Sequence, residues 1–217
     1  MGDRTTRSML VLLAVVALLQ FGYPLTVFGR LWTGVYLMLH LVMITYSTLV
    51  ARREKVRAPG ATPVGILFGV SVLWHALQQG SETSQTVMFA AAALYTALVI
   101  AELSVFTFRK SKVGSGGLIL AALSTYLLIG ALFSAVYSLV ALGSPESFAG
   151  AGERVDWRAM SYFSFTTQST LGYGDITPMT VGARALSSLQ SVTAALFLAI
   201  VIARLVSVWR RDARSAG

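Results

Sequence analysis

The chain has 217 residues, of which 55 % are hydrophobic and only 12 % are charged, about half the charged share of an ordinary soluble domain. This composition excludes a disordered chain, and it leaves too few polar residues to cover a water-soluble globule of this size. The absence of cysteine excludes disulfides, thiolate metal sites and cysteine nucleophiles. The net charge of +8 comes from basic residues that lie between hydrophobic runs, a pattern typical of a membrane protein rather than of a nucleic-acid-binding protein.

Hydrophobic runs of roughly 20 residues, the length that spans a bilayer as a helix, follow one another along the chain. They predict an all-α membrane protein with six transmembrane helices, at 8–28, 31–50, 62–79, 85–107, 117–142 and 180–208. The third run is the weakest, because its clearly apolar part is only Val64–Leu77. A shorter apolar segment at 157–168 cannot span a bilayer, and it predicts a re-entrant helix.

The basic residues indicate the orientation of these helices. With the N-terminus inside, 13 of the 17 basic residues fall on the inner side, and the outer side keeps Arg30, Arg154, Arg158 and Arg184. This asymmetry fits the positive-inside rule. We therefore expect a multi-pass protein of the cell membrane with both termini in the cytoplasm.

Two breaks rich in proline or glycine divide the chain, and the second resembles a module boundary. The expected domains are a four-helix transmembrane domain at 1–110, a glycine-rich linker at 111–117, a pore domain at 118–208 and a short cytoplasmic tail at 209–217. The assignment of 118–208 to a pore depends on the segment that follows the predicted re-entrant helix.

That segment reads Thr-Leu-Gly-Tyr-Gly at 170–174. Irregular backbone is tolerated at membrane depth only where it is buried in protein or lines an aqueous path. Alternating glycines permit positive φ, so such a strand can turn successive carbonyl oxygens to one side. Carbonyl oxygens are hard ligands that can replace the water shell of a cation, and the C-terminus of the preceding helix adds partial negative charge. The segment is therefore suited to hold dehydrated monovalent cations, although the residues alone leave open a surface turn in a transporter or membrane enzyme.

Thr170–Asp175, TLGYGD, resembles the filter signature of potassium channels, usually TVGYGD, and the resemblance extends over about 117–208. It implies that K⁺ is bound by the Thr170 hydroxyl and carbonyl and by the carbonyls of Leu171, Gly172 and Tyr173, with Gly174 at the mouth. Leucine at 171 replaces the usual valine and should preserve coordination, because that position offers its carbonyl.

The resemblance also implies a set of residues that support the filter, namely Tyr162, Thr166, Thr167 and Asp175. Many family members brace the filter with a pore-helix tryptophan where this chain has Tyr162 and Phe163. Phe163 cannot donate a hydrogen bond, so the brace is either weaker or made by Tyr162. Asp175 commonly ties the outer end of the filter to the pore helix, but Thr166 stands where some members carry its glutamate partner. The partner of Asp175 is left open.

The last hydrophobic run is free of charge over Ala185–Ala203, about 28 Å of helix. Ala195, Leu198, Ile202 and Val206 fall near one helical face and are candidates for the pore lining or an apolar gate. The alternative is that this stripe packs against the outer helix of the pore. Ala194 and Ala195 stand where family members often have a hinge glycine, which puts a hinged opening in question.

The six-span layout resembles that of voltage-gated channels, but the fourth run lacks their repeated arginines: Glu102 is the only charged residue in 83–108. His40 and His75 lie within predicted spans. A structural hydrogen bond is favoured over a functional role for each, and two histidines without cysteine make a poor metal site.

Together these features predict a potassium-selective channel that is not an enzyme and uses no cofactor besides K⁺ as the permeant ion. One filter segment per chain predicts a homotetramer, because a filter of carbonyl rings takes four such loops. The expected partners are membrane lipid and K⁺ ions, with no nucleic acid, and the sequence names no small-molecule regulator. A weakly selective monovalent cation channel and an ion transporter subunit are the alternatives.

Overall fold

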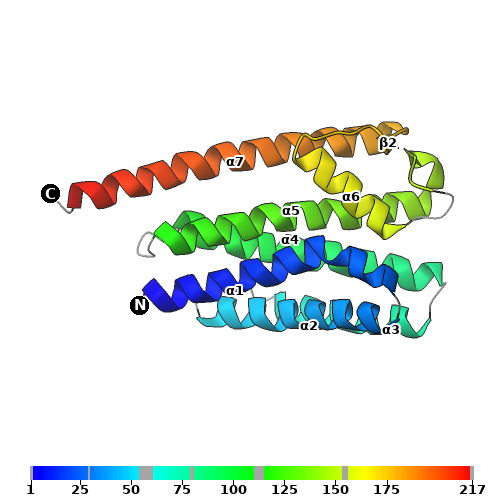
Figure 1. Ribbon diagram of the computed structural model, residues 1–217, viewed down its shortest axis with the longest axis horizontal. Helices are drawn as coiled ribbons and strands as arrows, with labels where there is room; N and C mark the ends of the chain where they lie inside the picture. The colour runs from blue at the N-terminus through cyan, green and yellow to red at the C-terminus, as the bar shows by residue number, and fades with distance from the viewer. Residues whose placement is uncertain are drawn as a thin grey trace.

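The computed structural model describes residues 2–28, 30–53, 61–78, 81–109, 115–152 and 156–215. These residues form a bundle of long helices with a shorter helix held between two of them at one end (Figure 1). Most of the predicted linker, 111–114, and the predicted outer residue Arg154 lie outside the described residues.

The first half of the chain contributes α1 (Gly2–Phe21), the 3₁₀ helix η1 (Tyr23–Phe28), α2 (Arg30–Arg53), α3 (Ala61–Leu77) and α4 (Glu82–Arg109). The prediction of one helix over 8–28 was wrong at its C-terminal end. The α-helix stops at Phe21 because Gly22 and Pro24 follow, and proline has no backbone N–H to continue the hydrogen-bond ladder. The chain turns instead through η1, where the Leu25 N–H donates to the Gly22 carbonyl.

The second half consists of α5 (Ser115–Gly143), the short 3₁₀ helix η2 (Pro145–Ser147), strand β1 (Phe148–Ala149), α6 (Trp157–Gln168), strand β2 (Thr177–Pro178) and α7 (Val181–Ser215). Helix α5 begins inside the predicted linker, since glycines are tolerated in a first turn whose N–H groups have no partner within the helix. Helix α7 likewise continues through most of the predicted tail. The antiparallel β1–β2 pair is an addition to the predicted all-helical fold.

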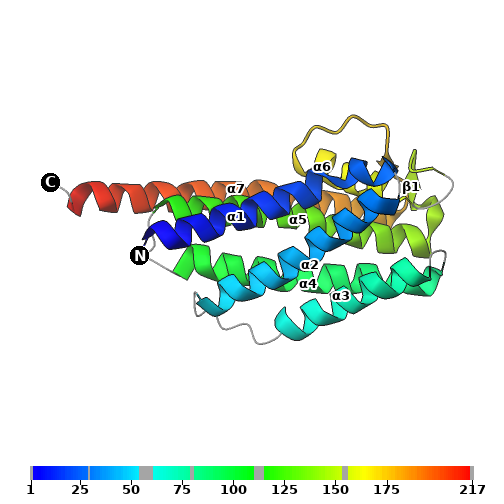
Figure 2. The same ribbon diagram turned by 60° about the horizontal axis from the view of Figure 1, so that its bottom comes forward.

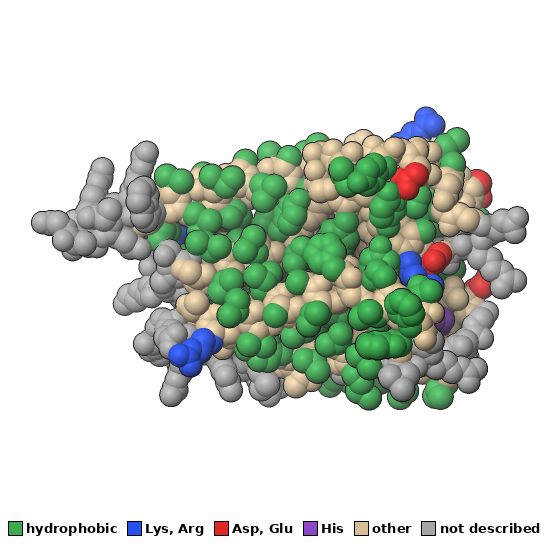
Figure 3. Space-filling model, in the orientation of Figure 1, with side chains coloured by type: hydrophobic (Ala, Val, Ile, Leu, Met, Phe, Trp, Pro, Cys, Tyr) green, Lys and Arg blue, Asp and Glu red, His purple; other side chains and the backbone are tan. Residues whose placement is uncertain are grey.

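Among the described residues, three helices, α4, α5 and α7, are long and apolar enough to cross a membrane, while Thr5–Phe21, Met38–Ser47 and Ala61–Leu77 are shorter apolar helices. The six predicted runs are thus all helical, but only half of them meet both length and hydropathy requirements. On the face in Figure 3, hydrophobic side chains cover the middle of the molecule and charged side chains gather toward its ends. This distribution is typical of a protein that crosses a bilayer.

Helix α5 lies at the centre of the bundle, against α1, α4, α6 and α7 (Figures 1 and 2). The N-terminal half of α5 shares a core of buried side chains with α1 and α4, which includes Leu12, Tyr95, Phe106 and Leu128. Both chain termini lie at one end of the bundle, and α6 with the β1–β2 pair lies toward the other (Figure 1). Residues 170–174, called the filter segment below for the signature that they resemble, therefore lie far from the termini.

Candidate functional site: the pore helix and filter segment

The short helix α6 is fixed at its N-terminus by Asp156, whose carboxylate accepts a hydrogen bond from the Arg158 N–H at 2.9 Å. Asp156 is thus an N-cap, a position that aspartate favours because its side chain satisfies one of the free N–H groups of the first turn. The helix ends at Gln168, and the Ser169 N–H returns to the Phe165 carbonyl at 3.0 Å. The predicted re-entrant helix at 157–168 is confirmed as a helix with the same bounds.

The backbone after α6 alternates in handedness. Thr170, Gly172 and Gly174 have φ of +60°, +52° and +81°, and Thr170 is the only residue other than glycine with positive φ in the described part of the chain. This is the alternation that lets successive carbonyls face one side. The C-terminus of α6 leads directly into it, so the partial negative charge of the helix end lies beside the segment.

Hydrogen bonds from the last turn of α6 hold this backbone. The carbonyl of Thr166 accepts the N–H groups of Leu171 at 2.9 Å and Gly172 at 3.1 Å, and the Thr167 carbonyl accepts that of Thr170 at 3.2 Å. The Thr166 hydroxyl donates within the helix to the Phe163 carbonyl. Thr166 therefore contacts the filter segment through its backbone.

Tyr162 interacts with Asp175, and this interaction raises the pKa of Tyr162 to about 12. Its ring also stacks on that of Tyr173, with centroids 6.5 Å apart and planes 5° from parallel. Phe163 points elsewhere, into a cluster with Tyr137 and Phe148. Of the two residues that stand where the family has tryptophan, Tyr162 supplies the brace.

A buried polar network behind α6 is centred on Gln190 of α7, which has no exposed surface. Its Oε1 accepts a hydrogen bond from the Tyr137 hydroxyl at 2.7 Å, and its Nε2 donates to the Ser164 hydroxyl at 2.8 Å. Ser164 in turn donates to the Gly130 carbonyl of α5. The sequence analysis missed Tyr137 and Ser164, because nothing local in the sequence marks them.

A second feature missed from the sequence is Gly150, beside the outer end of the filter segment. Its φ is +82°, and a Cβ there would lie 1.9 Å from the Asp175 carbonyl oxygen. The β1–β2 pair, which sets Ala149 against Thr177, produces this close approach. The signal available in the sequence was a glycine in the short segment between two predicted helices.

The candidate pore-lining residues of α7 all stand exposed on the isolated subunit: Ala195, Leu198, Ile202 and Val206. The buried residues among the described part of α7 are Ala183, Gln190, Ala194, Val201 and Val208. The four candidates therefore do not pack against the outer helix α5 within the subunit. This disfavours the alternative that the stripe serves to pack α7 against that helix.

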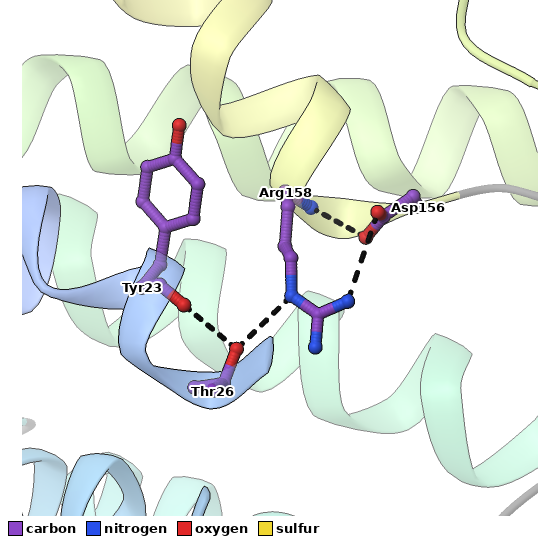
Figure 4. Close-up of polar contacts among 4 residues, drawn as sticks. All are labelled: Tyr23, Thr26, Asp156 and Arg158. Carbon is purple, nitrogen blue, oxygen red and sulfur yellow. Dashed lines mark hydrogen bonds and ion pairs between the residues drawn. The ribbon is translucent and has the colours of Figure 1, made fainter. Parts of the chain in front are cut away.

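The first helices contact the N-terminal end of α6 directly. Arg158 Nε donates to the Thr26 hydroxyl at 3.0 Å, that hydroxyl donates to the Tyr23 carbonyl, and Arg158 Nη1 lies 3.8 Å from Asp156 (Figure 4). Next to this contact, the ring of Tyr36 stacks on Trp157 with centroids 5.5 Å apart. The pore helix is thus held from the N-terminal half of the chain as well as from α5 and α7.

The two histidines make the structural hydrogen bonds that were favoured. His40 Nδ1 lies 3.0 Å from the Tyr36 carbonyl on its own helix, and His75 Nδ1 lies 3.0 Å from the Ser84 hydroxyl on α4. Among the residues that the structure describes, no group of three or more potential metal ligands comes together.

Comparisons with known proteins agree with this geometry. Residues 121–211, which include α6, the filter segment and most of α5 and α7, match the family model described as "Ion channel". The chain is also 32 % identical over 79 residues to the potassium channel protein kcv of Paramecium bursaria Chlorella virus 1, an alignment that covers 36 % of this chain and 83 % of the viral protein. No solved structure matches the chain. The chain therefore belongs to the ion channel family: it is a multi-pass membrane protein with an ion channel pore domain, and it is not an enzyme.

Proposed function

We propose that this protein is a potassium-selective channel in which Thr170, Leu171, Gly172 and Tyr173 bind dehydrated K⁺, with Gly174 at the outer mouth. The observation that carries the proposal is the alternating backbone at 170–174, anchored by the Thr166 and Thr167 carbonyls. Carbonyl dipoles on one side of such a segment replace the hydration shell of a cation. The similarity to a protein named as a potassium channel supports K⁺ as that cation.

The pore is formed by four copies of the chain. A single subunit leaves the filter segment without a facing wall, and Tyr173 is 69 % exposed in it. Only 17 % of the most apolar stretch of α7 is buried within the subunit, against 56 % for α5. A cyclic tetramer that surrounds the filter axis covers these surfaces and completes the carbonyl rings.

Within this tetramer the exposed stripe of α7, from Ala195 to Val206, lines the path on the inner side of the filter, where an apolar constriction gates by dewetting. The pore domain spans 118–208, and the first four helices, within 1–110, form a four-helix domain that packs against it. The protein lies in the cell membrane with both termini in the cytoplasm, as the excess of basic residues on that side indicates.

Planar-bilayer recording of the purified protein tests this proposal. We expect discrete single-channel currents in symmetric K⁺, carried by particles that mass photometry sizes as tetramers. Currents too small for a pore, at the turnover of a carrier, would instead identify a transporter subunit. Equal currents in K⁺ and Na⁺ would identify a weakly selective cation channel.

A further inference from the structure

A cavity of about 630 Å³ lies between the N-terminal helices and the pore helix, apart from the filter. Its walls come from α1, η1, α2, α3, α4, α5 and α6 of one subunit. The volume falls in the range of cavities that hold small-molecule ligands. Its residues are not used by the proposed conduction path.

The two ends of this cavity differ in chemistry. Toward the middle of the bundle its wall is mostly apolar, with the His40 ring packed edge-on against Phe68. The apolar side chains there are those of Met43, Phe68, Val72, Met88 and Leu128. At the end where α1 finishes and α4 and α6 begin, it is lined by polar side chains: Gln20, Thr26, His75, Gln85 and Arg158. An occupant that matches both ends is amphipathic, with its apolar part at membrane depth.

The polar end retains unused hydrogen-bond donors. Arg158 uses Nε for Thr26, has Nη1 3.8 Å from Asp156 and has Cζ 5.5 Å from the centroid of the Trp157 ring, while Nη2 forms no hydrogen bond in the described part of the chain. The side-chain amides of Gln20 and Gln85 form no hydrogen bond with the described residues either. Guanidinium groups bind oxyanions in particular, through charge-assisted hydrogen bonds. The donors therefore favour an anionic head group.

We propose that this cavity binds one acyl chain of a membrane lipid that carries an anionic head, with the chain between Phe68 and Leu128 and the head at Arg158. The bilayer is the source of such a ligand, because the cavity lies among the apolar helices that the membrane surrounds. An apolar cavity of this size gains little from water, whereas a hydrocarbon chain fills it favourably.

The bound chain contacts the element that carries the filter. Trp157, Arg158 and Ser161 of α6 line the cavity, and the Ser161 hydroxyl lies 2.8 Å from that of Ser134 on α5. Occupancy therefore stabilises the position of α6. Its effect on conduction rests on the proposed function, whereas binding itself does not.

Binding is measured by fluorescence quenching in the full-length protein in detergent. Substituting Trp32→Phe, Trp74→Phe and Trp209→Phe leaves Trp157, at the cavity wall, as the one tryptophan. A fatty acid brominated on its chain should quench Trp157 saturably. Ala92→Phe and Ala131→Leu, which fill the cavity from α4 and α5, should abolish saturable quenching, whereas Ala90→Phe, on the exposed face of α4, should not.

A second arm tests the head group. A brominated alcohol of the same chain length should bind about tenfold more weakly than the carboxylate, as expected for the loss of one charge-assisted hydrogen bond. Arg158→Gln should remove this difference. Quenching that does not saturate, or that persists in both cavity-filling variants, overturns the site; equal binding of acid and alcohol overturns the anionic head. Failure of the protein to conduct K⁺ would leave these binding results unaffected.

Discussion

At the scale of single residues, Thr170 shows how the filter backbone is maintained. A residue with a Cβ in the left-handed region costs about 1–2 kcal/mol relative to its ordinary conformation. Here φ is +60°, the Thr170 N–H donates to the Thr167 carbonyl, and the next two N–H groups donate to the Thr166 carbonyl. These hydrogen bonds offset the conformational cost.

Gly150 provides a test of the outer support. Gly150→Ala should displace the Asp175 backbone, because φ is +82° and the added Cβ would lie 1.9 Å from the Asp175 carbonyl oxygen. We expect a loss of stability of about 1–3 kcal/mol, measured by thermal unfolding in detergent. Gly182→Ala is the matched control, since a Cβ there meets nothing within 4 Å. Equal stability of the two variants would contradict the proposed contact.

The interaction of Tyr162 with Asp175 predicts a flat pH response of selectivity. Because Asp175 raises the pKa of Tyr162 from 10.0 to about 12, the contribution of the protonated phenol is fully present below pH 10 and is lost as the pH rises through about 12. Selectivity should therefore be unchanged between about pH 6 and 9, and it should be lower in Tyr162→Phe at every pH in this range. Reversal potentials recorded between about pH 6 and 9 check this expectation. A pH-dependent change of selectivity that Tyr162→Phe removes would contradict it.

At the scale of elements, α6 is held on several sides: by Tyr137 and Gln190 through the buried network, by Gly130 of α5, and by Thr26 at its N-terminus. Polar groups at membrane depth must find partners within the protein, since no water replaces them. The network therefore fixes the rotation and depth of the helix that ends at the filter.

Gln190→Leu tests this role. It leaves the Tyr137 hydroxyl buried without its acceptor, and we expect destabilisation of about 1–3 kcal/mol in detergent unfolding. The double variant Tyr137→Phe with Gln190→Leu removes both partners and should regain part of that loss. Strictly additive effects of the two substitutions would be inconsistent with the hydrogen bond.

The positive φ of Gly172 and Gly174 was predictable because the glycines themselves permit it, whereas that of Thr170 was not expected. Gly22 and Pro24 signalled the end of α1 at Phe21, but the prediction gave more weight to the long apolar run that continues past them. Gln190 is 26 positions from Ser164 and 53 positions from Tyr137 in the sequence, so its contacts with them depend on how each helix is rotated about its own axis. No local pattern encodes such rotation, so these partners could not be assigned from the sequence.

In the whole molecule, the N-terminal helices occupy the place that a voltage sensor has in the six-span layout, but they lack its repeated arginines. Helix α4 packs along α5, yet 83–108 contains no lysine or arginine. The contacts of the N-terminal half reach α6 at Arg158 and Trp157 instead. We interpret these helices as a support for the pore helix rather than as a charge-moving device.

Open probability should accordingly depend weakly on voltage. Moving one elementary charge through the membrane field yields about 2.3 kcal/mol per 100 mV, and the only charge within 83–108 is Glu102. Recording open probability at strongly negative and strongly positive potentials in symmetric K⁺ checks this expectation. A steep sigmoid that survives Glu102→Gln would reveal gating charge elsewhere in the chain.

The central claim is that the backbone at 170–174 selects K⁺, and the reversal potential with K⁺ on one side and Na⁺ on the other tests it most directly. Each tenfold preference for K⁺ displaces that potential by about 59 mV. We predict a displacement beyond this value for the unmodified channel and for Gly182→Ala, and a potential near zero or no current for Gly172→Ala, since φ of +52° suits glycine. A reversal potential near zero in the unmodified channel, or one that Gly172→Ala leaves unchanged, would contradict the claim.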